Sequence, residues 1–273
     1  MKTLGRPFWI AVGWLGGLTA LAIFASWLPI NDPNEIVARD ARLGPSFSHY
    51  FGTDALGRDV FARTIFGARI SLLVGFLAII FGVVVGGGLG IIAGYFRGLT
   101  DQVISFCFFT LLSFPALVLA LLITATIDRN QWTVSLTLGI LSIAPVGRRS
   151  RANTIVFAER EFVQAARVLG ASGKRIITHE LLPNVMIPMG ALALLGMGIA
   201  IVAEGSLAFL GLSVEGDAVS WGKSIVDGSQ ARDLEHNPHV ALFPIGVMFL
   251  TVLALNYAGD RVREYLDVRE TAF

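Results

Sequence analysis

The run Ser71-Leu-Leu-Val-Gly-Phe-Leu-Ala-Ile-Ile-Phe-Gly-Val-Val-Val-Gly-Gly-Gly-Leu-Gly-Ile-Ile-Ala-Gly-Tyr95 contains no charged residue. About 20 apolar residues in a helix cross the hydrocarbon core of a membrane. A chain in lipid that is not a barrel satisfies its backbone polar groups internally, so the run predicts a transmembrane helix. Glycines at 82, 86, 90 and 94 line one face of that helix and let a second helix approach closely, either inside the chain or at a subunit interface.

Similar apolar runs recur along the chain. Its 273 residues are 54% hydrophobic and only 15% charged, whereas soluble domains are about a quarter charged. We therefore predict an all-α, polytopic membrane protein with six transmembrane helices. The predicted spans lie near 8–29, 71–95, 102–127, 131–147, 184–206 and 240–258, and the fourth is the shortest.

Prolines fall in or near four of these predicted spans, at 115, 145, 188 and 244. Membrane helices tolerate proline, and the residues indicate kinks that either surround a pathway or serve packing alone. The first apolar run, Phe8–Leu28, is longer than the roughly 7–15-residue core of a secretory signal, so we predict an uncleaved first span. Cys107 lies in an apolar run and is interpreted as a packing residue.

The distribution of Lys and Arg predicts the orientation, because these residues concentrate in short cytoplasmic loops. It predicts that both termini and the loop 148–183 are cytoplasmic, since this loop is rich in arginine while the outer segments carry as many acids as bases or more. The predicted division is a cytoplasmic tip with the first helix (1–30), an extracytoplasmic segment (31–70), a core of five helices (71–260) with an outer loop (207–239), and a cytoplasmic tail (261–273).

The cytoplasmic loop contains a short helix followed by a glycine. Phe162, Ala165, Ala166 and Leu169 are spaced to share one helix face. Glu161 stands in the first turn, where the helix dipole favours a negative charge, and Gly170 suits a helix end. Ser172 is placed to cap a second short helix with Lys174, Arg175 and Ile176. This amphipathic unit binds either a partner protein or anionic lipid.

The residues Gln164-Ala165-Ala166, Gly170 and Leu182-Pro183 resemble the cytoplasmic coupling motif of ABC importer permeases. That motif has Glu-Ala-Ala, three residues, Gly, nine residues, Ile, one residue and Leu-Pro. The spacing is kept here, but Gln164 replaces the Glu and Glu180 occupies the Ile position.

Four further stretches resemble dipeptide/oligopeptide permeases of the C-subunit type. They are Phe51–Val60 with Gly67–Gly75, Leu207–Leu212, Ser220–Gly222 and Asn256–Arg261. In order they cover most of the chain, so together they are far more specific than any one alone. The resemblance implies a MetI-like permease of a bacterial inner membrane, in which residues 71–260 would form the permease core.

The resemblance also implies partners: a homologous B-type permease, two ATP-binding subunits and an extracytoplasmic substrate-binding protein. ATP and Mg would be used by the partner ATPases, and this chain would bind no cofactor, metal or nucleic acid. The implied ATPase-coupling residues are Glu161, Gln164, Ala165, Ala166, Gly170, Leu182 and Pro183. Gly173-Lys174 lacks the upstream glycine and the following Ser or Thr of a phosphate-binding loop, so we expect no ATP hydrolysis by the chain itself.

Two other groups of polar residues are candidates for function. Asp54, Gly57, Arg58 and Asp59 form an extracytoplasmic motif, interpreted either as a structural ion network or as a docking surface for the binding protein. Glu204, near the outer end of the fifth span, is a speculative pathway residue, because carboxylates inside a membrane are functional candidates by default.

The sequence is compatible with several functions besides peptide import. The same machinery also suits a nickel chelate, glutathione or an opine. A membrane-embedded enzyme needs converging catalytic side chains, and the sequence carries no zinc-type spacing, nucleophile elbow or dinucleotide fingerprint. A secondary transporter normally shows more charge inside its spans and internal repeats.

Overall fold

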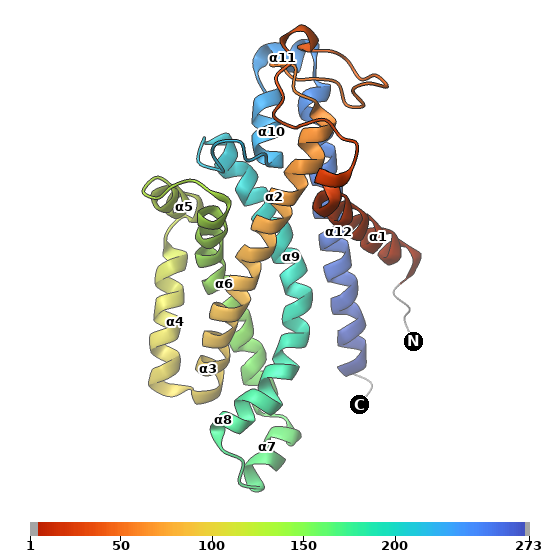
Figure 1. Ribbon diagram of the computed structural model, residues 1–273. Coiled ribbons are helices and arrows are strands. Elements are labelled where there is room, and N and C mark those ends of the chain that lie inside the picture. Colours follow the sequence, from red (N-terminus) through yellow and green to blue (C-terminus); the bar gives the residue numbers. More distant parts are fainter. Residues whose placement is uncertain (1–4, 271–273) are drawn as a thin grey trace.

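The computed structural model describes residues 5–270, which form helices joined by turns and one long outer segment (Figure 1). Within this described part there is no strand, only one isolated antiparallel bridge between Thr53 and Asp59. The α-helices are α1 Gly5–Phe24, α2 Val60–Phe81, α3 Gly88–Phe96, α4 Gly98–Ser113, α5 Ala116–Thr124, α6 Gln131–Ala158, α7 Glu161–Val168, α8 Gly173–Arg175, α9 Leu182–Phe209, α10 Trp221–Gly228, α11 Ala231–His236 and α12 His239–Glu270. Two π-helical turns, Gly82–Gly87 and Ile176–Leu181, continue α2 into α3 and α8 into α9.

The all-α membrane fold is confirmed, but the number of spans is not. Four helical stretches among the described residues are long and apolar enough to cross a membrane: Gly5–Trp27, Val60–Phe96, Gly173–Phe209 and His239–Leu266. The bent pair α4 and α5 makes up to five. The predicted fourth span lies in α6, which is helical but rich in Ser and Thr and continues into arginines, so it falls outside that group. Six spans stay a prediction.

The predicted third span, 102–127, is not one straight helix. α4 and α5 meet at an angle of 84°. The break lies at Phe114, which has extended backbone, and Pro115. Proline disfavours helical backbone in the residue before it, and this effect explains the break. By contrast, Pro145, Pro188 and Pro244 lie inside continuous helices.

The second span begins earlier than its hydropathy predicts. α2 starts at Val60, and Asp59 caps it by accepting a hydrogen bond from the backbone N–H of Ala62 at 2.9 Å. The helix then continues without interruption for 37 residues to Phe96. Its first turns therefore belong to the segment 31–70 that the sequence assigns to the outer side.

The glycine stripe of this long helix packs against α6, which confirms the prediction of close approach within the chain. A Cβ added at Gly86 would overlap the backbone of Ile143, and one at Gly94 would lie 2.8 Å from the carbonyl oxygen of Arg151. On α9, a Cβ at Gly196 would overlap Ile79 of α2. Small residues thus let α6 and α9 approach α2 and α3 at backbone distance.

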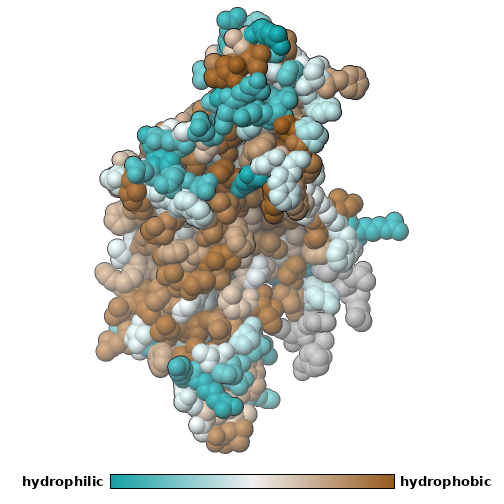
Figure 2. All heavy atoms as spheres, viewed as in Figure 1, coloured by the Kyte–Doolittle hydropathy of each residue, from teal (hydrophilic) through white to brown (hydrophobic). Residues whose placement is uncertain are grey.

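The polar parts lie at opposite ends of the molecule. The segment 31–59, α10 and α11 gather at the top of Figure 1, while α7 and α8 lie at the bottom. Figure 2 shows hydrophobic residues over the middle of this face and hydrophilic ones toward its two ends, as expected of a protein that spans a bilayer. The predicted cytoplasmic tip and tail include residues 1–4 and 271–273, which lie outside the described part.

Candidate functional site

The coupling helix predicted from sequence is α7, and its end has the predicted geometry. Gly170 has a φ of +80°, which is the left-handed conformation that favours glycine. The N–H of Gly170 donates to the carbonyl of Arg167 and that of Ala171 to the carbonyl of Ala166, both at 3.0 Å. These two bonds form a Schellman motif, which fixes the direction in which the chain leaves α7.

The main residue of α7 that packs on the rest of the chain lies outside the predicted stripe. Val163 is fully buried and Ala166 is half-buried, and both contact a cluster with Ile176 and Leu181. Phe162 and Ala165 are exposed, as are Glu161, Gln164 and Leu169. The residues of the predicted stripe are thus exposed or half-buried, and Val163, which is outside the stripe, makes the inward contact. What the exposed face binds stays a prediction.

The second half of the loop leads directly into a span. Ser172 caps α8, as predicted, by accepting a hydrogen bond from the N–H of Arg175 at 3.4 Å. The π-helical turn Ile176–Leu181 follows, and α9 begins at Leu182 with Pro183 in its first turn. Proline fits the first turn because the N–H it lacks has no helical partner there.

The two residues that depart from the coupling motif have local partners. The side-chain amide of Gln164 donates to the carbonyl of Glu159 at 3.1 Å, across the junction between α6 and α7. A glutamate carboxylate cannot donate this bond. The carbonyl of Glu180 accepts from the side chain of Asn184 at 2.6 Å. The first bond depends on the glutamine at 164, whereas the second uses the backbone of residue 180 and leaves the glutamate side chain there unexplained.

At the opposite end, the predicted motif forms a buried ion network. Asp54 accepts from the backbone N–H of Leu56 and Arg58, and its other oxygen accepts from Nε of Arg58 at 2.6 Å. Arg58 also donates to Asp227 of α10 at 2.9 Å, and Arg63 of α2 donates to the same oxygen at 2.7 Å. The network ties the segment 31–59 to α2, which follows it directly, and to α10, which lies far away in sequence.

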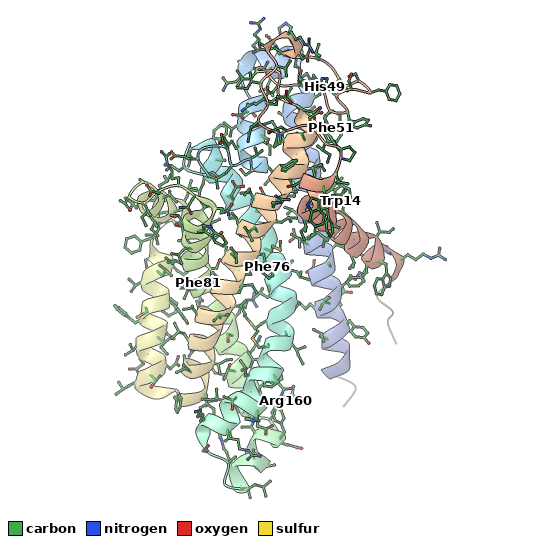
Figure 3. The ribbon with its side chains drawn as sticks, in the orientation of Figure 1. Trp14, His49, Phe51, Phe76, Phe81 and Arg160 are labelled. Carbon is green, nitrogen blue, oxygen red and sulfur yellow. The ribbon has the colours of Figure 1, made fainter. Side chains whose placement is uncertain are left out.

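Two further members of the motif shape the same region. Asp59 caps α2 and accepts from His49 at 2.9 Å and from Asn31 at 3.1 Å. Gly57 has a φ of +81°, and a Cβ there would overlap the backbone of Val37. His49 and Phe51 lie at this end of the molecule and Arg160 at the other (Figure 3).

Several members of this network were not predicted as site residues. Arg63 and Asp227 join it through tertiary contacts. The ion pair Arg42–Asp233, at 2.5 Å, lies beside it, because the backbone N–H of Arg42 donates to the carbonyl of Asp54. Lys223 of α10 is affected by the network: burial lowers its pKa, the cations Arg63 and Arg58 lower it further, and Asp227 opposes the change. In the sequence Arg63 stands eight residues before the predicted span 71–95, and no motif marks it as a member of the network.

Glu204 is fully buried where α9, α2 and the loop after α9 meet. Its carboxylate accepts from Ser213 at 2.5 Å and from Ser71 at 3.3 Å. The hydroxyl of Ser71 in turn accepts from the backbone N–H of Trp221, at the start of α10. In this conformation Glu204 therefore holds three segments together and reaches no surface, and its place in a pathway stays a prediction.

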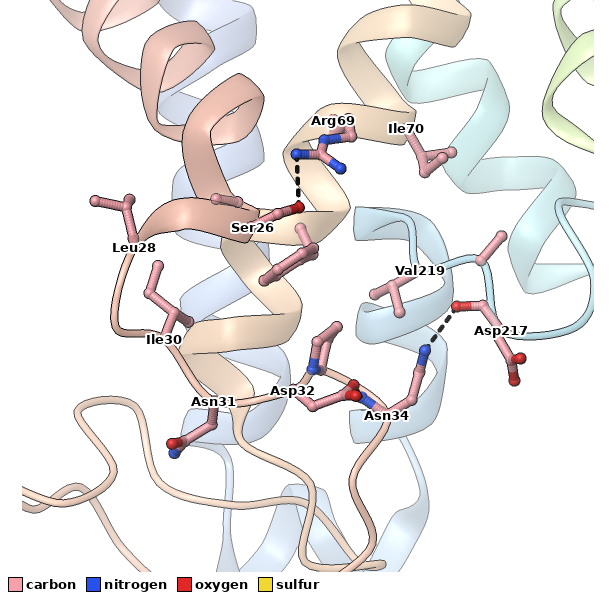
Figure 4. Close-up of a pocket in the computed structure, with 14 residues that line it drawn as sticks. Ser26, Leu28, Ile30, Asn31, Asp32, Asn34, Arg69, Ile70, Asp217 and Val219 are labelled. Carbon is pink, nitrogen blue, oxygen red and sulfur yellow. Dashed lines mark hydrogen bonds between the residues drawn. The ribbon is translucent and has the colours of Figure 1, made fainter.

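A cavity of about 500 Å³ opens beside this outer region (Figure 4). The turn after α1, the side of α2 and residues 217–219 line it. Arg69, its cation, donates to the carbonyls of Ala22 and Ile23 at the end of α1 and to Ser26. None of the predicted site residues lines the cavity. Within residues 5–270, no group of three or more His, Cys, Asp or Glu is arranged to hold a metal ion.

Comparisons with known proteins agree with this architecture. Residues 86–271 match the family model described as binding-protein-dependent transport system inner membrane component. The dipeptide transport system permease protein DppC of Alkalihalophilus pseudofirmus is 38% identical over 90% of this chain and 81% of its own length. The glutathione transport system permease protein GsiD of Shigella dysenteriae is 37% identical over 92% of this chain and 82% of its own length.

A solved structure shows the same fold at low sequence identity. It is an inward-facing form of the MetNI methionine ABC transporter, one chain of which is 18% identical to this one. It superimposes with a TM-score of 0.60 over 76% of this chain and 95% of its own length. Together with the family match and the permease relatives, these findings show that the chain belongs to the family of binding-protein-dependent transport system inner membrane components, as a multi-pass, MetI-like ABC importer permease.

Proposed function

We propose that this chain is the transmembrane subunit of an ATP-driven importer of di- or oligopeptides and forms half of the translocation pathway. The observation that carries the coupling role is the exposed tip of α7. Val168 and Leu169 are 87% and 86% exposed, although both are aliphatic and lie at a polar end of the molecule. Apolar side chains on a capped, well-defined turn are suited to fill a pocket in a protein partner.

The partner at this tip is an ATP-binding subunit. Glu161, Gln164, Ala165 and Gly170 lie on the exposed side or end of α7, next to the two aliphatic residues. Leu182 and Pro183 start α9, so movement of α7 is passed along the chain to this span. ATP and Mg are held by two such subunits, and a B-type permease completes the pathway.

The orientation follows from charge. Arg160, Arg167, Lys174 and Arg175 are all exposed around α7 and α8. By the positive-inside rule, this supports a cytoplasmic location for this end. Both termini then lie in the cytoplasm too. The ion network of Asp54, Arg58 and Asp59 lies on the outer side, where it supports the surface that receives a substrate-binding protein.

Peptides are the favoured cargo because DppC is a dipeptide permease by name and matches most of this chain. Glutathione is the second candidate, because the GsiD relatives are almost as similar. In this proposal the substrate-binding protein selects the cargo. The coupling mechanism of this chain is therefore the same for a dipeptide and for glutathione.

The test is purification of the tagged chain from its native membrane, followed by reconstitution with whatever subunits accompany it. We expect a second permease and two ATP-binding subunits to co-purify, and ATP-dependent uptake of a labelled dipeptide once the binding protein is added. Uptake of glutathione in place of the dipeptide would change the cargo only. Recovery of the chain alone, active without ATP, would contradict the proposal.

A further inference from the structure

One aromatic residue joins the coupling segment to a span that is remote from it in sequence. Tyr95 is next to the last residue of the continuous helix Val60–Phe96. Its side chain packs against a cluster formed by the end of α6, by α7 and by the π-helical turn, with Ala158, Val163, Ile176 and Leu181 at its centre. The end of α3 thus packs on the same cluster as the end of α6, α7 and the π-helical turn.

The ring of Tyr95 is held from two sides. The guanidinium of Arg167, in the last turn of α7, lies over the ring, 5.5 Å from its centroid. Gly173, the first residue of α8, lies so close that an added Cβ would be 3.4 Å from the ring carbon Cε1 and from the hydroxyl oxygen. The ring therefore lies against both α7 and α8.

A second contact lies beside this one, but it is weak. Arg97 donates to Glu159 at 2.7 Å, joining the turn after α3 to the end of α6. Both side chains are half-exposed or more, at 51% and 67%, and exposed ion pairs contribute only about 0–1 kcal/mol. The packed ring of Tyr95, and not this ion pair, is the firm lateral connection between α7 and α3.

The direct connection from α7 to the membrane is less regular. It runs through α8, which is one turn long, and the π-helical turn Ile176–Leu181 before α9 begins. Such π-helical turns are frequent at functional sites, where a helix changes its register. The long helix Val60–Phe96, which carries Tyr95 near its end, contains a second π-helical turn at Gly82–Gly87. Movement at Tyr95 therefore acts on a helix that has its own irregular turn.

We propose that Tyr95 is a positioning residue that passes the movement of α7 to the helix Val60–Phe96 during transport. The inference rests on the proposed function, because it takes α7 as the contact with the ATP-binding subunit. In this account α7 moves two spans at once: α9 through the chain itself, and α2–α3 through the ring of Tyr95.

The test compares variants of the complete reconstituted transporter. Tyr95→Ala removes the ring, Tyr95→Phe keeps it, and Leu99→Ala is the matched control because Leu99 is 79% exposed in the same turn region. We expect Tyr95→Ala to retain its ATP-binding subunits and to hydrolyse ATP, while uptake per ATP hydrolysed falls about tenfold, equivalent to about 1.4 kcal/mol of lost coupling. Tyr95→Phe and Leu99→Ala should keep the wild-type ratio.

A second readout follows the movement itself. With Cys107 replaced by Ser, spin labels at Arg160→Cys and Leu99→Cys report the separation of the start of α7 from the start of α4. We expect this separation to stay the same with and without ATP when Tyr95 is present, and to differ between the two states in Tyr95→Ala.

Two results would overturn the inference alone: a wild-type ratio of uptake to ATP hydrolysis in Tyr95→Ala, or a loss of uptake that only parallels the loss of bound ATP-binding subunits. Failure of the unmutated chain to bind any ATP-binding subunit would instead overturn the proposed function, and this inference with it.

Discussion

Replacing Asp227 by Asn tests the outer ion network most sharply. One oxygen of Asp227 accepts from both Arg58, at 2.9 Å, and Arg63, at 2.7 Å. The side chain of Arg63 is 3% exposed and that of Asp227 is 31% exposed. Asp54 and Asp227 balance the two arginines, so Asp227→Asn leaves one buried positive charge without a counterion.

The expected magnitude follows from this burial. Breaking a buried ion pair costs about 3–5 kcal/mol, whereas an exposed pair contributes about 0–1 kcal/mol. Because Asp227 is partly exposed and Asn keeps one acceptor oxygen, we expect a loss of about 2 kcal/mol in the free energy of unfolding. For a chain of this size, that loss lowers the unfolding temperature by roughly 4–8 °C.

The assay is thermal unfolding of the purified transporter in detergent, with Asp217→Asn as the control. Asp217 is exposed at the same end of the molecule, and substitutions at such surface positions usually change stability by no more than about 0.5 kcal/mol. An equal unfolding temperature for the two variants would refute the view that Asp227 neutralises a buried arginine pair.

Three other substitutions give separate tests. Gly86→Ala should destabilise the chain by about 1–3 kcal/mol, since its Cβ meets backbone, while Gly88→Ala, with open space around it, should be neutral or stabilising in the same unfolding assay. Gly170→Val should impair binding of the ATP-binding subunits more than Gly170→Asn, because Asn tolerates the left-handed backbone; equal binding would contradict the need for that turn. Burial lowers the pKa of Lys223 in the folded chain, so the unfolded chain binds the proton of this ammonium group more tightly. The free energy of unfolding should therefore rise as the pH increases from the folded to the unfolded pKa of Lys223, and Lys223→Met should abolish this rise.

The sequence predicted the features that depend on local geometry. Gly170 at the end of α7, the cap at Ser172 and the glycine stripe from Gly82 to Gly94 are all as expected. Each follows from a residue's own backbone preference or from a spacing along one helix. No knowledge of distant contacts was needed.

The start of α2 was mispredicted for a tertiary reason. Hydropathy places the start of the predicted span at residue 71, because Arg63 and Arg69 interrupt the apolar pattern before it. In the structure Arg63 pairs with Asp227, and Arg69 donates to two carbonyls at the end of α1. Partners that are far away in sequence thus let charged residues lie within a continuous helix.

The inward face of α7 and the role of Tyr95 were hidden for a similar reason. The predicted stripe through Phe162 does not say which residue packs inward, and Val163 does so against Ile176 and Leu181, which come later in the chain. Tyr95 stands at the end of an apolar run some 70 residues before α7, and only the folded chain brings it under Arg167. The serine partners of Glu204 likewise come from separate segments.

The central claim is that the exposed tip of α7 contacts an ATP-binding subunit, and site-directed cross-linking tests it most directly. In a Cys107→Ser background, a cysteine at Leu169 carries a short thiol–amine cross-linker, and a cysteine at Leu56, 47% exposed at the opposite end, is the control. The account predicts a cross-linked product with an ATP-binding subunit from position 169 and none from position 56. A product with that subunit from position 56 would contradict the account. So would the absence of any product from position 169 in an assembled and active transporter.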